Sequence, residues 1–585
     1  MVIEPGMLSD KSFAESGFAA WRSLRASSIH LLASTLVRAT LPSITSILLL
    51  LSFAPFSYCF FAWVSYLPLL TYLTQPSSQK RSWLPVYIAG VLFYAWSNYP
   101  IAAASMSWMS PYWLGWIVLS GVCGLKFIAI GSLIIRFQRL RGHCLAIATP
   151  ISVVSVEYVS GEVLDILIGV TFPWTNIAMT QIDTPFIPQV ADIGGISLVA
   201  FLVLMANGLL ADALLRALFP RKSERKQIVG VACAACCLSA ACVYGAMSTA
   251  TSNSHVNVSI AIINGQLTLE GDLMARNELA ARTAASVAKD RRIKGQFDLC
   301  VWPEACWIGP PIEINPPPIS SDFPLWHRTL DRSLVLKGES VLEIEAMASS
   351  LGGTLLLGAT RVDSQTGCLF NSAIAVNGWN GVIGVYDKTR LAPFLEDVSR
   401  PIVRVLSEVF FSEFMGRRSR YRPGSRSLGA ACESEVPTDG TRVIPFICFD
   451  LCDSSLWRQR VFSCRNRPTI LVHLANEGLD RSGTLKLLFR DLCRYRAIEC
   501  RRAIVRSVSG GLSGLIDANG GMCNAFDTSS GRVHVAHHSD VPARIGATLF
   551  IRLGDWVQRL SLIYTSFVVC YGYVQVWRGM RVGLT

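Results

Sequence analysis

Long apolar runs crowd the first 250 residues of the chain, and they restrict what this part can fold into. Each run comes close to the roughly 20 residues that an α-helix needs to cross a bilayer. We predict eight membrane spans, at 42–56, 57–75, 83–105, 112–135, 144–161, 194–215, 227–248 and 558–576. The first two are short halves of one apolar stretch that the residues SFAPF interrupt.

Basic residues gather in every second loop between these spans. The clusters are Arg22, Arg25 and Arg38; Lys80 and Arg81; Arg136, Arg139 and Arg141; Arg221, Lys222, Arg225 and Lys226; Arg578 and Arg581. The alternate loops, around Ala54, around Met109 and at 161–190, contain no Lys or Arg. Because Lys and Arg concentrate in cytoplasmic loops, we expect both chain ends in the cytoplasm and residues 249–557 in the periplasm.

This pattern divides the chain into four parts. They are a cytoplasmic N-terminal arm (1–41), a seven-span membrane domain (42–248), a periplasmic domain (249–557), and a final transmembrane helix with a cytoplasmic tail (558–585). The formal net charge of +12 fits this anchoring. Since the basic residues are scattered over loops, the charge does not indicate nucleic-acid binding, and we expect no nucleic-acid partner.

The periplasmic region alternates short β-like segments with helical ones. Helices are predicted at 270–289 and 339–353. The predicted strands are VNVSIAIIN (256–264), DLCVWPE (298–304), TLLLGATRV, SAIAVNG, GVIGVYDK, VIPFICFD and TILVHLAN. Such alternation is typical of a layered α/β domain.

Three polar residues stand at the ends of these apolar strands, namely Glu304, Lys388 and Cys448. Taken singly, each is more often a solvated strand end or a packing cysteine than a functional group. Taken together, a carboxylate, an ammonium and a thiol are the groups that acyl transfer through a thioester requires. The carboxylate accepts the thiol proton, the thiolate attacks an acyl carbonyl, and the cation stabilises the thiolate and the oxyanion.

The motifs around these residues resemble a known family. WPE, YDKTRLAPF and ICFD are similar to the Glu-Lys-Cys triad of the nitrilase, or carbon–nitrogen hydrolase, superfamily, whose fold is an αββα sandwich. In the membrane half, LSFAPFSYCFFAWVSYLPLL, FPWTNIAMTQ and QVADIGGISLVAFLVLMANGLL resemble the apolipoprotein N-acyltransferase family, as do RAIECRRAIVRSVSGGLSGLIDANG and RLGDW further on. The implied fold class is a polytopic α-helical membrane domain plus an extramembrane α/β nitrilase-like sandwich.

The resemblance implies roles for individual residues. Glu304 is the expected general base, Lys388 the cation beside the oxyanion, and Cys448 the nucleophile. The expected supporting or substrate-binding residues are Glu396, Phe449 and Asn371. The chemistry requires no metal or cofactor, and we recognise no phosphate-binding glycine loop or paired His/Cys ligand spacing.

The chain also departs from the family pattern. Phe449 stands where the family usually has Tyr, Asp450 where Glu is common, and NEGLD (476–480) where the family usually has Asn-Asp-Ala-Trp-Phe. The missing Trp implies altered substrate contacts or weakened activity. Cys452 is a rival nucleophile, but Cys448 is favoured because it lies at the strand end, where the motif places it.

The family resemblance implies a reaction in two steps at the inner membrane. A membrane phospholipid donates an acyl chain to Cys448, which passes it to the N-terminal amine of the diacylglyceryl-cysteine of an apolipoprotein. We expect a monomer, with the catalytic domain facing the periplasm. Residues 395–421 are equally compatible with an amphipathic arm at the membrane interface and with a packed surface helix.

Three other functions stay open at this level. A membrane-tethered amidase would use the same triad with water as acceptor, and a catalytically weakened homologue would form no acyl-enzyme. A transporter ranks last, because Lys126 is the only Lys or Arg well inside a predicted span, whereas transport paths are lined by intramembrane charges.

Overall fold

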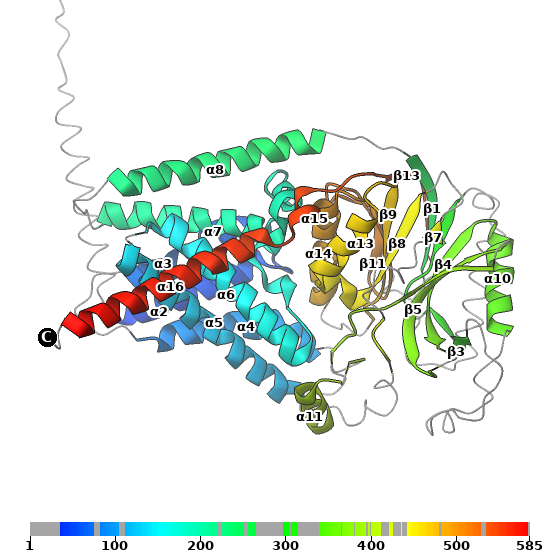
Figure 1. Cartoon of the computed structure of the whole chain (residues 1–585), viewed down its shortest axis with the longest axis horizontal. Helices are drawn as coiled ribbons and strands as arrows, with labels where there is room; N and C mark the ends of the chain where they lie inside the picture. The colour runs from blue at the N-terminus through cyan, green and yellow to red at the C-terminus, as the bar shows by residue number, and fades with distance from the viewer. Residues whose placement is uncertain are drawn as a thin grey trace, which may run out of the picture.

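The computed structural model joins a helical half to an α/β half (Figure 1). It describes residues 35–74, 82–103, 112–141, 143–218, 225–250, 256–264, 297–304, 306–313, 339–363, 366–378, 381–393, 396–397, 399–410, 421–424, 434–435, 441–478, 483–527 and 534–582. The predicted helix at 270–289 and most of the N-terminal arm lie outside these residues.

Helices occupy the positions of the predicted membrane spans. They are α2 (Thr35–Ser52), η1 (Cys59–Trp63), α3 (Leu67–Thr74), α4 (Leu84–Ala103), α5 (Tyr112–Arg141), α6 (Leu145–Ile168), α7 (Ala191–Leu218), α8 (Arg225–Ala250) and α16 (Trp556–Val582). Among the described residues, three helical stretches are long and apolar enough to cross a membrane: Gly115–Leu140, Ile187–Leu218 and Val229–Ser248. The number of eight spans therefore stays a prediction.

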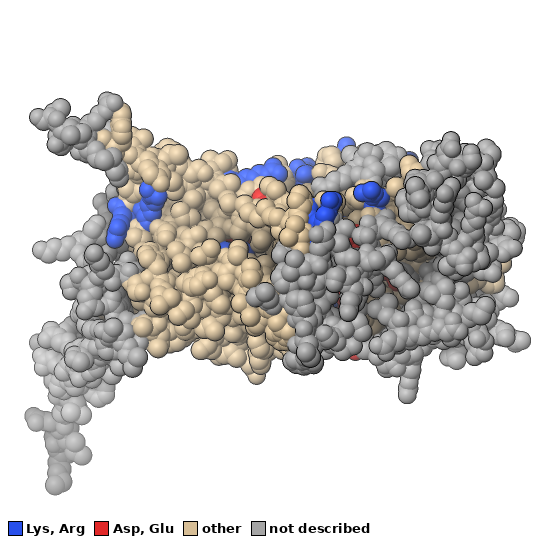
Figure 2. Space-filling view, turned by 90° about the horizontal axis from the view of Figure 1, so that it is seen from below, with Lys and Arg blue, Asp and Glu red and all other residues tan. Residues whose placement is uncertain are grey.

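The surface of the helical half suits a lipid environment. Large apolar side chains point outward from several helices, among them Ile117, Val122, Ile166 and Val243. Figure 2 shows Lys and Arg side chains at the outer end of this half and again along its junction with the α/β half, with a largely uncharged surface between them. Charged side chains at two levels with an apolar belt between them are typical of a membrane-spanning unit.

The α/β half is built on two sheets. The first has the strand order β13-β1-β2-β4-β5-β6, with β3 paired to β4, and the second has the order β12-β11-β10-β9-β8-β7. The strands are β1 (Val256–Asn264), β2 (Leu299–Val301), β3 (Trp307–Glu313), β4 (Thr354–Val362), β5 (Leu369–Asn377), β6 (Gly381–Asp387), β7 (Ser434–Glu435), β8 (Arg442–Ile447), β9 (Thr469–Asn476), β10 (Ile504–Ser509), β11 (Leu512–Ile516), β12 (Met522–Asp527) and β13 (His534–Ala543).

The two sheets face each other across a shared apolar core, to which Val258 and Ile260 contribute from the first sheet and Val443 and Val472 from the second. The helix α10 (Glu339–Leu351) covers the outer face of the first sheet. The helices α13 (Ser454–Ser463) and α14 (Thr484–Cys500) cover the second sheet. The order helix, sheet, sheet, helix confirms the predicted αββα sandwich.

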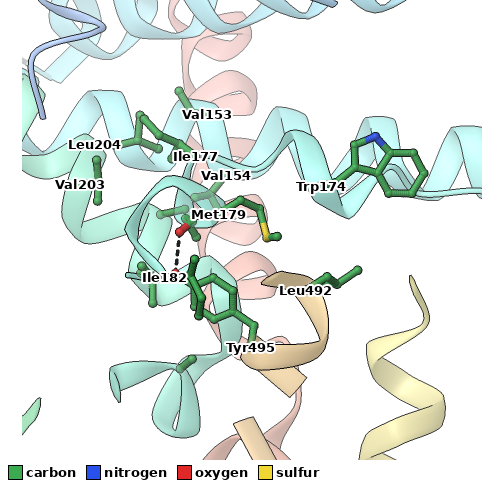
Figure 3. Packing of buried hydrophobic residues seen from close by; sticks show 14 of the residues in the cluster. Val153, Val154, Trp174, Ile177, Met179, Ile182, Val203, Leu204, Leu492 and Tyr495 are labelled. Atoms are coloured by element: carbon green, nitrogen blue, oxygen red, sulfur yellow. Dashed lines mark hydrogen bonds between the residues drawn. The ribbon is translucent and has the colours of Figure 1, made fainter. Parts of the chain in front are cut away.

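The helical half and the α/β half share one apolar core. Figure 3 shows Leu492 and Tyr495 of α14 packed among Met179 and Ile182 of the segment that precedes α7. The Tyr495 hydroxyl also donates to the carbonyl oxygen of Ala178 at 2.5 Å. Because α14 is buried between its own sheet and the membrane helices, the α/β half is seated on the helical half.

A kink in α7 makes room for this seating. Gly195 has a φ of +67°, a conformation that residues with a Cβ rarely adopt, and a Cβ there would meet the ring of Phe550 at 2.6 Å. The kink leaves the amide of Ile196 free of the helix ladder, and it donates to Glu499 Oε1 of α14 at 3.0 Å. Glycine at this position therefore lets the α/β half approach the membrane helix closely.

Candidate active site

Cys448 lies at a sharp turn that ends β8. The strand stops at Ile447, and Cys448 opens the short 3₁₀ helix η8 (Cys448–Cys452). Its φ of +47° is unusual for a residue other than glycine. Non-glycine residues in this region cluster at functional sites, where the surrounding structure holds the strained conformation in place.

Lys388 follows β6 directly and brings the predicted acidic residues together. Its buried ammonium lies 3.0 Å from Glu304 Oε1 and 2.8 Å from Glu396 Oε2. Asn371 of β5 donates its Nδ2 to Glu304 Oε1 at 2.7 Å and to Glu396 Oε1 at 2.9 Å. Four of the predicted site residues thus form one hydrogen-bonded cluster.

The charges of this cluster change the pKa of the Cys448 thiol. Desolvation, followed by the negative charge of Glu304, raises the pKa of the thiol well above its ordinary value, and the positive charge of Lys388 opposes this. Burial alone would lower the pKa of Lys388, but the Cys448 thiolate, when it forms, and the carboxylates of Glu304 and Glu396 raise it well above its ordinary value. At neutral pH the site therefore holds a protonated thiol beside a charged lysine, and the thiol needs a base to become a nucleophile.

The rival thiol, Cys452, lies in a different electrostatic setting. Burial raises its pKa to about 12, and the charges acting on it are those of Arg496, Arg390, Asp453 and Asp450. Cys448, in contrast, interacts with Glu304, Lys388 and Glu396. The structure thus groups Cys448, and not Cys452, with the carboxylate and the lysine.

Asp450 connects the turn at Cys448 (the nucleophile turn) to the residues that follow Lys388 (the lysine loop), a role that its sequence motif did not reveal. Its Oδ1 accepts from the backbone amides of Thr389 at 3.1 Å and Arg390 at 2.7 Å. Its Oδ2 accepts from the amide of Ile447 at 2.9 Å and from the Tyr386 hydroxyl at 2.7 Å. Because all four bonds end on one buried carboxylate, the positions of Cys448 and Lys388 depend on each other.

Phe449 packs against the helical half. Its ring lies edge-on to Trp174, with 6.5 Å between the ring centroids, and edge-on to Phe489 at 5.9 Å. Trp174 comes from the short segment Pro173–Thr175, which precedes α7. The residue after the expected nucleophile therefore contributes to an aromatic cluster shared by both halves of the molecule.

Buried polar side chains, namely His473, Arg506 and Glu477, lie next to the nucleophile turn. Nothing in the sequence indicated that His473 contacts this turn. This β9 residue places Nε2 3.2 Å from the carbonyl oxygen of Cys448. Burial, aided by the charge of Arg506, lowers the pKa of His473 to about 3, so the imidazole is neutral at physiological pH. Arg506 in turn forms a buried ion pair with Glu477.

The segment NEGLD (476–480), which differs from the family pattern, begins beside these buried polar residues and includes Glu477. The backbone amide of Asn476 donates to Glu304 Oε2 at 2.8 Å, which fixes the second oxygen of that carboxylate. Leu479 and Asp480 lie outside the described residues. Within the part of the chain that the structure describes, no group of three or more His, Cys, Asp or Glu side chains is placed to hold a metal ion.

Comparison with known proteins agrees with this architecture. Residues 259–462 match the family model for a carbon-nitrogen hydrolase, so the fold and the site define a member of the nitrilase superfamily. Residues 45–209 match the model for the apolipoprotein N-acyltransferase N-terminal domain. The chain therefore belongs to the apolipoprotein N-acyltransferase family.

Curated relatives match most of the length of this chain. An apolipoprotein N-acyltransferase of Geobacter metallireducens is 24% identical over 88% of this chain and 91% of its own, and one of Rhodopirellula baltica is 24% identical over 87% and 93%. Among solved structures, a CN-hydrolase superfamily protein of Xanthomonas campestris matches at 20% identity and a TM-score of 0.31, over 48% of this chain and 90% of that chain. Nit3 of Saccharomyces cerevisiae matches at 16% identity and a TM-score of 0.34, over 49% and 92%.

Proposed function

We propose that this chain is an acyltransferase that completes lipoprotein maturation. It takes a fatty acyl chain from a membrane phospholipid, holds it as a thioester on Cys448, and transfers it to the N-terminal amine of a diacylglyceryl-cysteine. The observation that carries this proposal is the ammonium of Lys388 between the carboxylates of Glu304 and Glu396, beside the Cys448 turn. Membership of the family supports the lipoprotein substrate.

In the first step, Glu304 accepts the proton of the Cys448 thiol and the sulfur attacks the ester carbonyl of the phospholipid. A carbon–sulfur bond forms, and the carbonyl oxygen becomes an oxyanion that the ammonium of Lys388 stabilises. When the intermediate collapses, the ester carbon–oxygen bond breaks. The departing lysophospholipid alkoxide takes the proton from Glu304, which leaves the acyl-enzyme.

In the second step, the neutral amine of the apolipoprotein attacks the thioester. Glu304 accepts a proton from the attacking nitrogen, the carbon–nitrogen bond forms and the carbon–sulfur bond breaks. The Cys448 thiolate then recovers its proton from Glu304, so the enzyme returns to its starting state. Asn371 and Glu396 hold the carboxylate and the ammonium in place throughout.

Membrane anchoring serves this reaction. We infer the four-part organisation described above, in an inner-membrane, multi-pass protein that acts as a monomer with its catalytic domain on the periplasmic side. Both substrates are amphiphiles of one leaflet, so a site seated on the helical half meets them at high effective concentration and in a fixed orientation. The contact between Phe449 and Trp174 supports this seating.

Intact-mass measurement tests the proposal. Purified protein incubated with phospholipid should gain one acyl mass in the wild type and in Cys452→Ala, and none in Cys448→Ala. Addition of a diacylglyceryl peptide should then remove the acyl mass and produce the N-acylated peptide. Label on Cys448→Ala but not on Cys452→Ala would make Cys452 the nucleophile.

The same experiment separates the rival functions. Release of free fatty acid without acylated peptide would identify a membrane-tethered hydrolase of the amidase type. A wild type that never gains an acyl mass would identify a catalytically weakened homologue.

A further inference from the structure

Two short helices of the α/β half lie side by side next to the start of the last membrane helix. They are α13 and α15 (Leu549–Leu553), and Figure 1 shows α15 beside α13 and directly before α16. The amide of Gly546 donates to the carbonyl of Arg465 at 2.8 Å. A Cβ on Gly554 would come within 3.1 Å of the Arg458 guanidinium. The segments 458–465 and 546–554 therefore run next to each other in opposite directions.

The outer face of this pair exposes large apolar side chains. Phe462 of α13 is 40% exposed, and Leu549 and Leu553 of α15 are 45% and 52% exposed. The exposed apolar face continues onto α16 with Leu560 and Ile563. A strip of this kind that runs from a catalytic domain onto a membrane helix is typical of an interfacial element.

Arginine side chains accompany the apolar residues. The guanidinium of Arg465 stacks on the ring of Phe462, 4.3 Å from its centroid, and Arg552 and Arg559 are exposed. Asp555 is the only carboxylate in segments 454–467 and 545–563. Its side chain is partly buried and accepts from the Ser454 hydroxyl at 3.4 Å, and its charge interacts with Arg496 and also with Arg559 and Arg458. The surface therefore combines apolar groups with a net positive charge, because a single, partly buried carboxylate accompanies several arginines.

We propose that this α13–α15 surface lies in the headgroup layer of the membrane and binds anionic phospholipid headgroups. The guanidinium groups match phosphate geometry and attract an anionic leaflet, while Phe462, Leu549 and Leu553 enter the boundary with the acyl chains. The proposal rests on the proposed function only in placing the α/β half against that leaflet. The bound lipid is held by its headgroup and need not be the acyl donor.

The surface lies one helix away from the nucleophile turn. The N-cap of α13 is Asp453, whose Oδ1 accepts from the amides of Ser455 and Leu456 at 3.1 Å each. The indole of Trp457, in the same helix, donates to the carbonyl of Asp450 at 2.9 Å. Lipid bound to α13 and α15 would therefore fix the height of the Cys448 turn above the leaflet.

Photo-cross-linking tests this surface without requiring acyl transfer. The full-length protein is placed in phosphatidylcholine nanodiscs that carry either a photoactivatable phosphatidylglycerol or a photoactivatable phosphatidylcholine, and the labelled peptides are mapped. The phosphatidylglycerol probe should label peptides from 454–467 and 545–560 more strongly than the phosphatidylcholine probe. Arg552→Gln/Arg559→Gln should reduce the phosphatidylglycerol label by about fivefold per arginine.

Matched variants make the outcome specific. Arg552→Lys/Arg559→Lys keeps the charges and should retain most of the label. Arg136→Gln/Arg139→Gln removes two arginines from the other end of the helical half and should leave the label at 545–560 unchanged. Equal labelling by the two probes, or an unchanged label in Arg552→Gln/Arg559→Gln, would overturn the proposal. A label that falls equally in the Arg136/Arg139 variant would also overturn it.

Discussion

The guanidinium of Arg390 donates to both carboxylate oxygens of Asp165, at 2.7 and 3.1 Å, and so joins the lysine loop to the last turn of α6. Its Nε also donates to Asp453 at 2.9 Å. Ten residues further on, Arg400 donates to the carbonyl oxygen of Ile166 at 2.7 Å. The segment that carries Lys388 and Glu396 is therefore fixed to α6 of the helical half at both of its ends.

We expect Arg390→Lys to slow acyl transfer by about ten- to a hundredfold, because lysine cannot form the paired hydrogen bonds and Lys388 loses its fixed position. Single-turnover transfer to a diacylglyceryl peptide measures the effect. The matched control is Asp183→Asn, which breaks another ion pair between the two halves, that of Asp183 with Arg494 at 2.6 Å. Asp183 is 62% exposed, so its loss should leave the rate unchanged. Equal rates for wild type and Arg390→Lys would contradict this role.

Removal of the Glu304 carboxylate or the Lys388 ammonium should slow thioester formation, and removal of the ammonium should also destabilise the fold. Glu304→Gln should slow acylation of Cys448 by about 10²–10⁴-fold, the usual scale for a general base. Lys388→Ala should be at least as severe, and it leaves two buried carboxylates facing each other, a change that destabilises by about 3–5 kcal/mol. Rapid-quench intact-mass measurement gives the rates, and thermal unfolding gives the stabilities. Acylation of Glu304→Gln at the wild-type rate would exclude Glu304 as the base.

The pKa of the Cys448 thiol should appear in its reaction with iodoacetamide. Since desolvation and Glu304 raise this pKa well above the ordinary value, the alkylation rate should still be rising above pH 9. Lys388→Ala should react more slowly at each pH, because Lys388 lowers the thiol pKa. Cys452→Ala serves as the control and should keep the wild-type profile. A rate that levels off near pH 7 would show a thiolate at rest and contradict this assignment.

Strand positions could be predicted well from the sequence. VNVSIAIIN and TLLLGATRV coincide with β1 and β4, and GVIGVYDK overlaps β6. β4 is buried over most of its length, so its apolar residues are continuous and easy to recognise, whereas β6 is only partly buried. The strand predicted for DLCVWPE (298–304) is too long, since only Leu299–Val301 is a strand and the chain then turns at Glu304. The strands β3 and β7, and those from β10 to β13, were not predicted.

The site could be predicted only where a motif marked it. Glu304, Lys388, Glu396 and Asn371 lie together as expected. The bond between Arg390 and Asp165 joins residues 225 positions apart, and no local pattern indicates such a pair. His473 is hidden for another reason, because a histidine within an apolar strand has the same local pattern as a packing residue.

The proposed topology predicts the activity of fused reporters. The basic loops alternate with loops that lack Lys and Arg, which places residues near Thr251 in the periplasm and residues near Lys222 in the cytoplasm. A reporter that is active only in the periplasm should therefore be active when fused near Thr251 and inactive when fused near Lys222. The reverse pattern would place the candidate site on the cytoplasmic side and would remove the lipoprotein assignment.

His473 should make the fold sensitive to acid. Its folded pKa of about 3 lies below the ordinary 6.5, so the unfolded chain binds more protons between these values. The stability that depends on a neutral His473 is therefore complete above pH 6.5 and is lost as the pH falls towards 3. At pH 5 this loss amounts to about 2 kcal/mol. His473→Gln has no group that titrates here, and its free energy of unfolding should fall less than that of the wild type between pH 7 and pH 5, by about that amount. Thermal unfolding of both proteins at the two pH values measures the difference. Other titrating groups affect the two proteins alike. Equal losses of stability would therefore show that His473 is not held neutral.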